Sequence, residues 1–273
     1  MRKHVVWLLL FVLLFTGPAS AAGAADESGW ELVVPGIEFS QFQLPDPNNV
    51  FVARMDRTNP TVTLESTIAN GKLLEPDFLG RETVSGMFSR YDQALNFWGG
   101  NTNPHSWGLR NQAVVGINGI YFNYTTGIPQ GGQVQAGWYV QRYEDNGGWG
   151  GFTWKLDRSA FIGECVTHQP EKQVISYPAT GVSQQIAHIN TPREINDLVL
   201  YTPQWNSRTG TEDAGVEVLV EMTRPTMILP MPAFASGIVR QIYQDQGNNL
   251  IPFNSIVLSD RGTQGQTLLE NVN

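Results

Sequence analysis

The stretch with the clearest chemical potential is residues 112–122, QAVVGINGIYF, in which an apolar run ends at an Asn-Gly pair. The apolar run Val114–Ile117 predicts a short buried strand covered on both faces. Asn118 and Gly119 would then lie at the strand end, where an Asn-Gly pair tolerates positive φ and a carboxamide can hold a polar ligand. The same residues also fit an ordinary turn that precedes a core Tyr121–Phe122 pair.

A second polar group follows about seventy residues later and combines several residue types that suit binding or catalysis. Its order along the chain is an Asn-x-x-Arg element, a strand ending in LYTPQW, a polar Thr-x-Thr loop and a strand that begins GVEV. Its polar and aromatic members are Asn190, Arg193, Tyr201, Thr202, Trp205, Thr209, Thr211, Gly215 and Glu217.

Both groups resemble the phosphodiester glycosidase family, whose members include the enzyme that uncovers mannose 6-phosphate by removing N-acetylglucosamine from a phosphodiester. The family strand ends in Asn-Gly-Gly-Tyr-Phe, and here Ile120 replaces the second glycine. The second group matches the family's spaced motifs at each of the nine positions just given. The resemblance covers the chain from about Thr83 to Leu258.

The resemblance implies an exported hydrolase that cleaves the glycosidic bond of sugar-1-phosphodiesters in envelope polysaccharide or exopolysaccharide. Such a reaction builds positive charge on the sugar ring and releases an anionic phosphate. We therefore expect Arg193 and Glu217 to be catalytic, with Arg193 clamping the phosphate and Glu217 as the carboxylate on the ring side. Asn118 and Asn190 would orient the substrate. The full set of expected substrate-binding residues is Asn118, Gly119, Tyr121, Phe122, Asn190, Thr209 and Thr211.

The sequence departs from the family near its end. Family members continue with an Asp-Gly-Arg element and a Leu-Asp-Gly-Gly-Gly-Ser element, and neither string occurs in this chain. We expect either a fragment of a longer protein or a relative that has lost or moved its catalysis. The alternative function is a non-catalytic carbohydrate-binding or envelope-associated module on the same fold, with tryptophans as sugar platforms. The candidate platforms are Trp98, Trp107, Trp138, Trp149 and Trp205.

Other kinds of site find little support. Cys165 and His168 could form a thiol–imidazole pair, but the apolar residues before Cys165 favour a packed cysteine. The histidines lack the spacing of a metal site and no calcium loop is present, so no metal ligand is expected. No nucleotide fingerprint occurs, and the cofactor requirement stays open.

The N-terminal segment and the net charge indicate where the protein is located and which kinds of partner it can bind. Residues 1–21 have a basic head, a short apolar run and a small-residue cleavage site, which predict a signal peptide. Residues 22–29 are predicted to form a flexible leader. Removal of Arg2 and Lys3 moves the net charge from −8 to −10, with 15 basic against 25 acidic residues. So acidic a chain repels nucleic acid and anionic lipid. We expect a secreted or cell-envelope protein, without stable membrane insertion after cleavage, that binds carbohydrate.

The elements that must position these residues are mostly strands. The 273 residues, 41% hydrophobic with 28 Gly and 16 Pro, predict one α+β domain over residues 30–273 with a mixed, strand-rich sheet. An opening meander is expected over residues 30–67. The clearest helix is residues 83–97, where apolar residues recur at steps of three and four after a Thr83 cap. Further short strands follow up to residue 259, and no element is expected after it.

Overall fold

The computed structural model describes residues 29–46, 48–73, 80–97, 112–135, 138–142, 151–155, 157–163, 169–223 and 234–272. The chain divides into two units, residues 1–63 and 64–273. The predicted signal peptide and all of the leader except its last residue, residue 29, lie outside the described residues. In the described part of the chain, the strand-rich mixture of small sheets with two α-helices confirms the predicted α+β class.

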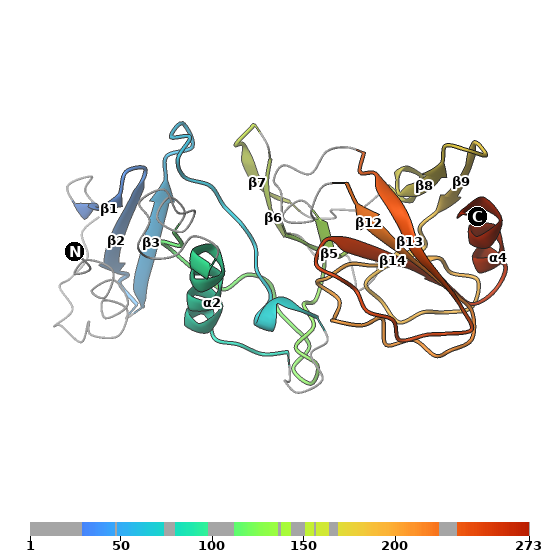
Figure 1. Ribbon diagram of the computed structural model, residues 1–273. Helices are drawn as coiled ribbons and strands as arrows, with labels where there is room; N and C mark the ends of the chain where they lie inside the picture. Colours follow the sequence, from blue (N-terminus) through green and yellow to red (C-terminus); the bar gives the residue numbers. More distant parts are fainter. Residues whose placement is uncertain are drawn as a thin grey trace. The chain divides into compact units, whose positions relative to one another are not determined.

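The first unit contains a three-stranded antiparallel meander (Figure 1). Its strands are β1 (Glu31–Val34), β2 (Ile37–Gln43) and β3 (Asn49–Met55). Gly36, at φ +92°, makes the tight turn between β1 and β2. Arg54 of β3 pairs with Glu38 of β2 at 2.5 Å and also covers the Trp30 ring. The predicted meander is thus confirmed for its first three strands.

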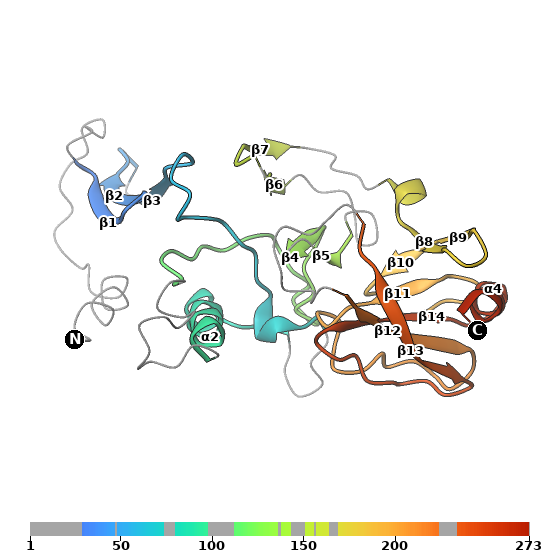
Figure 2. The same ribbon diagram turned by 45° about the horizontal axis from the view of Figure 1, so that its top comes forward.

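The second unit is built on a five-stranded sheet with the order β10-β11-β14-β12-β13 (Figure 2). These strands are β10 (His188–Ile189), β11 (Val199–Tyr201), β12 (Val216–Met222), β13 (Gly237–Gln244) and β14 (Ser255–Asp260). β10 and β11 run parallel, whereas β14 is antiparallel to both β11 and β12. The last strand along the chain therefore lies in the middle of the sheet, where all six of its residues are buried.

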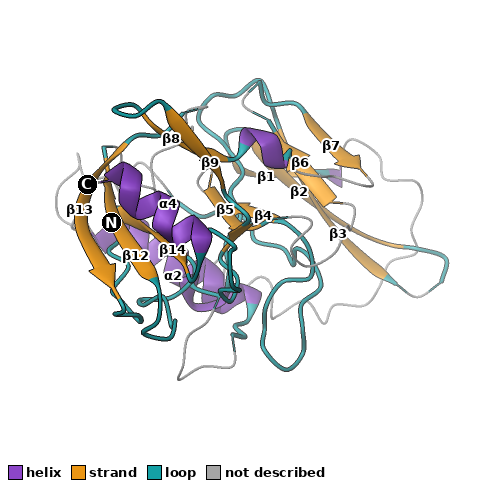
Figure 3. Ribbon diagram, turned by 90° about the vertical axis from the view of Figure 1, so that its right-hand side faces the viewer, coloured by secondary structure: helices purple, strands orange, loops and turns teal. Residues whose placement is uncertain are grey.

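The sheet is covered on both faces, which its sequence pattern explains. Alternate residues of a strand point to opposite faces. Leu200, Val218 and Leu258 belong to one apolar cluster, together with Leu268 of helix α4 (Thr263–Val272). Val199, Tyr201 and Val257 belong to a second cluster with Ile68, Leu73 and Val140. Figure 3 shows α4 lying over β12 and β14.

Three hairpins supply the other strands described in this unit. They are β4 (Gln133–Gln135) with β5 (Trp138–Gln141), β6 (Gly151–Trp154) with β7 (Ala160–Gly163), and β8 (Val174–Tyr177) with β9 (Val182–Gln185). A short 3₁₀ helix, η3 (Pro170–Lys172), precedes β8. Val140 of β5 is fully buried in the second apolar cluster, so this hairpin covers part of the central sheet.

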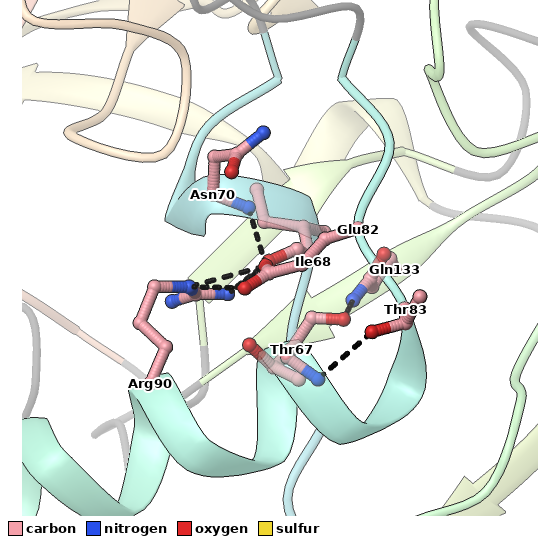
Figure 4. A network of polar contacts seen from close by, with 8 residues as sticks. Thr67, Ile68, Asn70, Glu82, Thr83, Arg90 and Gln133 are labelled. Atoms are coloured by element: carbon pink, nitrogen blue, oxygen red, sulfur yellow. Dashed lines mark hydrogen bonds and ion pairs between the residues drawn. The ribbon is translucent and has the colours of Figure 1, made fainter.

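Helix α2 (Val84–Phe97) confirms the predicted helix and its cap. The Thr83 hydroxyl accepts a hydrogen bond from the backbone N–H of Gly86 at 3.0 Å. Figure 4 shows how Arg90 of α2 joins the 3₁₀ helix η2 (Ala69–Gly71), since it pairs with Glu82 at 3.0 Å and donates to the Ile68 carbonyl at 2.7 Å. Glu82 also accepts the Asn70 N–H at 2.9 Å. This network connects the start of α2 to the 3₁₀ helix η2.

Three predicted features of the chain are wrong. Residues 112–117 form no strand, and Val115 and Ile117 are 43% and 82% exposed. The segment packs beside α2 instead, where a Cβ on Gly116 would lie 3.3 Å from both Val84 and Phe88. Residues 61–67 also form no strand. Finally, helix α4 follows β14 and covers the sheet where no such element was expected.

Candidate functional site

The site is organised around the carboxylate of Glu217, which is 1% exposed in the middle of the sheet. Glu217 lies on β12 directly opposite Ser259 of β14, and Ser259 lies opposite Val199 of β11. These three residues thus share the face that carries the second apolar cluster. A buried carboxylate is costly unless donors surround it.

Four side chains supply those donors. The hydroxyls of Thr211, Ser259 and Thr209 donate to Glu217 at 2.7, 3.0 and 3.1 Å, and the Asn249 carboxamide donates at 2.7 Å. The Asn249 backbone N–H adds a longer contact of 3.4 Å. All four donors come from outside β12, so the carboxylate joins β14, the 206–214 loop and the 245–250 loop. We call these five residues, with Arg193, the Glu217 cluster.

Arg193 reaches the same cluster through one hydroxyl. Its Nη1 donates to the Ser259 Oγ at 3.1 Å, while its Nη2 donates to the carbonyls of Glu212 and Ala214 at 2.9 and 2.7 Å. Three of its five N–H groups are therefore used within the described residues. The guanidinium is half-buried. It holds the turn before β12, and its other two N–H groups make no hydrogen bond to the described residues.

Gly215 makes this arrangement possible. Its φ is +114°, and a Cβ at this position would lie 2.4 Å from the Asp260 carbonyl and 3.2 Å from the Arg193 guanidinium. A glycine is therefore required for Arg193 and β14 to approach the start of β12.

Tyr201 and Trp205 form the aromatic wall beside the cluster. Both are buried, and their ring centroids lie 5.4 Å apart. The Trp205 indole donates to the Thr209 carbonyl at 2.9 Å, which holds the Thr-x-Thr loop in place. Burial raises the pKa of Tyr201 above its ordinary value, Arg193 lowers it and Glu217 raises it, so this phenol remains protonated through neutral pH. Trp205 is 5% exposed and its ring packs against Tyr201, so it presents no open face on which a sugar could stack.

Asn190 has a clear structural role. Its carboxamide donates to the Val140 carbonyl at 2.9 Å and to the Thr202 hydroxyl at 2.8 Å, and it accepts the Thr202 N–H at 2.8 Å. It is 3% exposed and adopts φ +54°. Asn190 thus clamps β5 and the ends of β10 and β11 together, and both ends of its carboxamide are already used.

The first predicted group lies outside the Glu217 cluster. Asn118, Gly119, Tyr121 and Phe122 are all exposed, and no hydrogen bond among the described residues connects them to the cluster. Phe122 forms an isolated bridge with Pro129 and stacks on Tyr124 at 6.2 Å. The strand expected to carry Asn118 to a sheet rim is absent, so the physical basis of that placement is wrong.

Sequence reasoning missed Ser259 and Asn249. Ser259 stands in an apolar strand, SIVLSD, where its position opposite Glu217 depends on strand register. Asn249 follows Asn248, which has φ +54°, in a turn whose sequence resembles any polar loop. The one available signal was a serine at a core-facing strand position, where polar residues are uncommon unless hydrogen-bonded.

Two further kinds of site are not found within the described ranges. No group of three or more His, Cys, Asp or Glu side chains there could hold a metal ion. Among the same residues, no helix is both long and apolar enough to cross a bilayer. Cys165, His168, Trp98, Trp107 and Trp149 lie outside the described residues.

Comparisons with known proteins add little about function. No protein-family model matches this sequence, and no curated protein matches it. A solved structure described as a hypothetical protein from Synechocystis matches with a TM-score of 0.47 and 16% sequence identity. The match covers 84% of this chain but 36% of that protein, so this chain spans about a third of its length.

Proposed function

We propose that this chain is an exported hydrolase that cleaves the glycosidic bond of sugar-1-phosphodiesters in envelope polysaccharide or exopolysaccharide. The observation that supports the proposal best is that Arg193 and Glu217, expected to be catalytic, both hydrogen-bond to the Ser259 hydroxyl, at 3.1 and 3.0 Å. A cation and a carboxylate held this close suit a substrate that develops opposite charges on its two sides.

In the proposed reaction, water adds to the anomeric carbon while the bond from that carbon to the phosphate oxygen breaks. The phosphate leaves with the bonding electron pair as a monoester, and the attacking water loses one proton to the bulk solvent. The two remaining N–H groups of Arg193 would stabilise the leaving phosphate, which needs little protonation because it is already anionic. Asn249 and Thr211, which are half-buried, each donate a hydrogen bond to the Glu217 carboxylate. Once one of these bonds breaks, a Glu217 oxygen would be able to stabilise positive charge on the sugar ring.

The test is release of free sugar from the methyl phosphodiester of N-acetylglucosamine 1-phosphate, measured by chromatography. Free N-acetylglucosamine and methyl phosphate are expected in equal amounts. Methyl α-N-acetylglucosaminide, which lacks the phosphate, is the matched control substrate and should stay intact. Cleavage of neither compound would overturn the hydrolase proposal.

A second candidate is a non-catalytic carbohydrate-binding module. The observation that favours it is that the Glu217 carboxylate already accepts four side-chain hydrogen bonds and that Glu217 is 1% exposed. A carboxylate held in this way stabilises the fold and does not contact a substrate. Binding of the phosphodiester, measured by calorimetry, without any release of sugar would select this function.

A further inference from the structure

Buried polar atoms without hydrogen-bond partners gather where β5, β10 and β11 end. Within the described residues these atoms include Gln141 Oε1, Thr191 Oγ1, Tyr201 OH and Gln204 Oε1. Each belongs to a strand end or to the segment just after it. Unpartnered buried polar atoms are rare, and each costs about 1–3 kcal/mol relative to a bonded one.

The topology brings these four groups to one edge of the sheet. β10 and β11 are parallel, so Thr191 and Tyr201 lie at the carboxyl ends of neighbouring strands. Asn190 bonds to both Val140 and Thr202, which adds the end of β5 to the same place. Ligands of sheets with parallel strands commonly bind beyond the carboxyl ends of the strands.

The chemistry of the four groups selects a class of ligand. Two hydroxyls can donate and accept, and two amide oxygens can only accept. None is charged, so the set does not suit an anion, but it complements the hydroxyl groups of a sugar ring. Tyr201 is also close enough to Arg193 and Glu217 for both charges to influence its ionisation.

We infer that these four residues form a subsite for the sugar ring beside Arg193, in which their unpartnered atoms hydrogen-bond to sugar hydroxyls. This inference rests on the proposed function in assigning the sugar, and it adds the residues that would select it. Thr191 and Arg193 are half-buried and form the entrance, whereas Tyr201 is fully buried and forms the floor.

Two isosteric variants test the subsite. Tyr201→Phe and Thr191→Val each remove one unpartnered oxygen and keep the shape of the side chain. Because that oxygen lacks a partner, the melting temperature should stay the same or rise, while sugar affinity falls about 10-fold, equivalent to about 1.4 kcal/mol. A structural role for these oxygens would instead lower the melting temperature and leave sugar affinity unchanged.

The chain offers a matched control in Tyr177→Phe. Tyr177 is also buried, but its hydroxyl donates to Gln184 Oε1 at 2.5 Å, and it belongs to the first apolar cluster, whereas Tyr201 belongs to the second. This variant should lower the melting temperature and leave sugar affinity unchanged, whereas Tyr201→Phe should lower sugar affinity without lowering the melting temperature.

The probes are methyl α-glycosides of glucose, galactose, mannose and N-acetylglucosamine, tested with the full chain by ligand-observed NMR. These neutral probes separate the inference from the proposed hydrolysis. Binding that Tyr201→Phe weakens supports the subsite even if no phosphodiester is cleaved. Failure of all four sugars to bind, or binding that neither variant changes, overturns the subsite even if the protein proves to be a hydrolase.

Discussion

Glu217 and Ser259 face each other across β12 and β14, and the serine hydroxyl that donates to the carboxylate also accepts from Arg193. Through this hydroxyl, the buried Glu217 carboxylate is connected to the half-buried Arg193. The residues are 42 positions apart in the sequence. Their contact is therefore a product of the sheet and not of a local motif.

Replacement of Glu217 by Gln should destabilise the protein by about 2 kcal/mol, because an amide NH₂ would face the Asn249 donor and leave buried hydrogen bonds unmade. Urea unfolding measures the change. Glu221→Gln is the control on the same strand, where a 36% exposed side chain pairs with Arg240, and it should cost less than about 1 kcal/mol. Equal losses in both variants would contradict a special role for the Glu217 cluster.

Arg193→Ala should weaken binding of glucose 1-phosphate at least 10-fold, because the proposed phosphate clamp is lost. Arg193→Lys keeps the charge but cannot reproduce the planar fork, so it should recover only part of the affinity. Isothermal titration calorimetry provides the measurement. Arg240→Ala, which removes an exposed cation on β13, is the control and should bind as tightly as the unmodified protein. An unchanged affinity for Arg193→Ala removes the clamp.

Gly215→Ala should cost at least about 2 kcal/mol, because the added Cβ would meet the Asp260 carbonyl at 2.4 Å and φ is +114°. Gly210→Ala is matched in its positive φ of +68° but meets nothing within 4 Å, so it should cost only about 1 kcal/mol. Chemical unfolding of both variants separates the close approach from backbone strain. If Gly210→Ala lowers the free energy of unfolding more than Gly215→Ala does, the close approach at Gly215 is not what requires a glycine there.

Stability should fall in alkaline solution as Tyr177 ionises. Burial raises the pKa of Tyr177 to about 12, above the ordinary value of 10.0 in the unfolded chain. The folded state therefore holds the proton between these values, and its stabilising contribution is fully present below pH 10 and lost as pH rises toward 12. The slope from this one group is at most about 1.4 kcal/mol per pH unit. Between pH 9 and 12, the free energy of unfolding should fall less steeply with pH for Tyr177→Phe than for the unmodified protein. Identical slopes for the two proteins would contradict this assignment to Tyr177.

Local pattern was sufficient to predict several elements. Helix α2 followed from its apolar spacing and the Thr83 cap, because both depend on residues within one or two turns. The strands of the opening meander followed from short extended runs separated by turn residues. Local pattern failed at residues 112–117, where an apolar run reads as a buried strand but packs beside α2 without a partner strand.

By itself, the sequence determined the strand-rich α+β class, the helix and the set of polar residues from Asn190 to Glu217, since these depend on residue type and short spacing. The tertiary structure alone decided which of those residues meet. It joined Arg193 and Glu217 through Ser259, turned Asn190 into a clamp and left Asn118 exposed. The reason is that strand order and register set contacts between distant residues, and no short stretch of sequence encodes them.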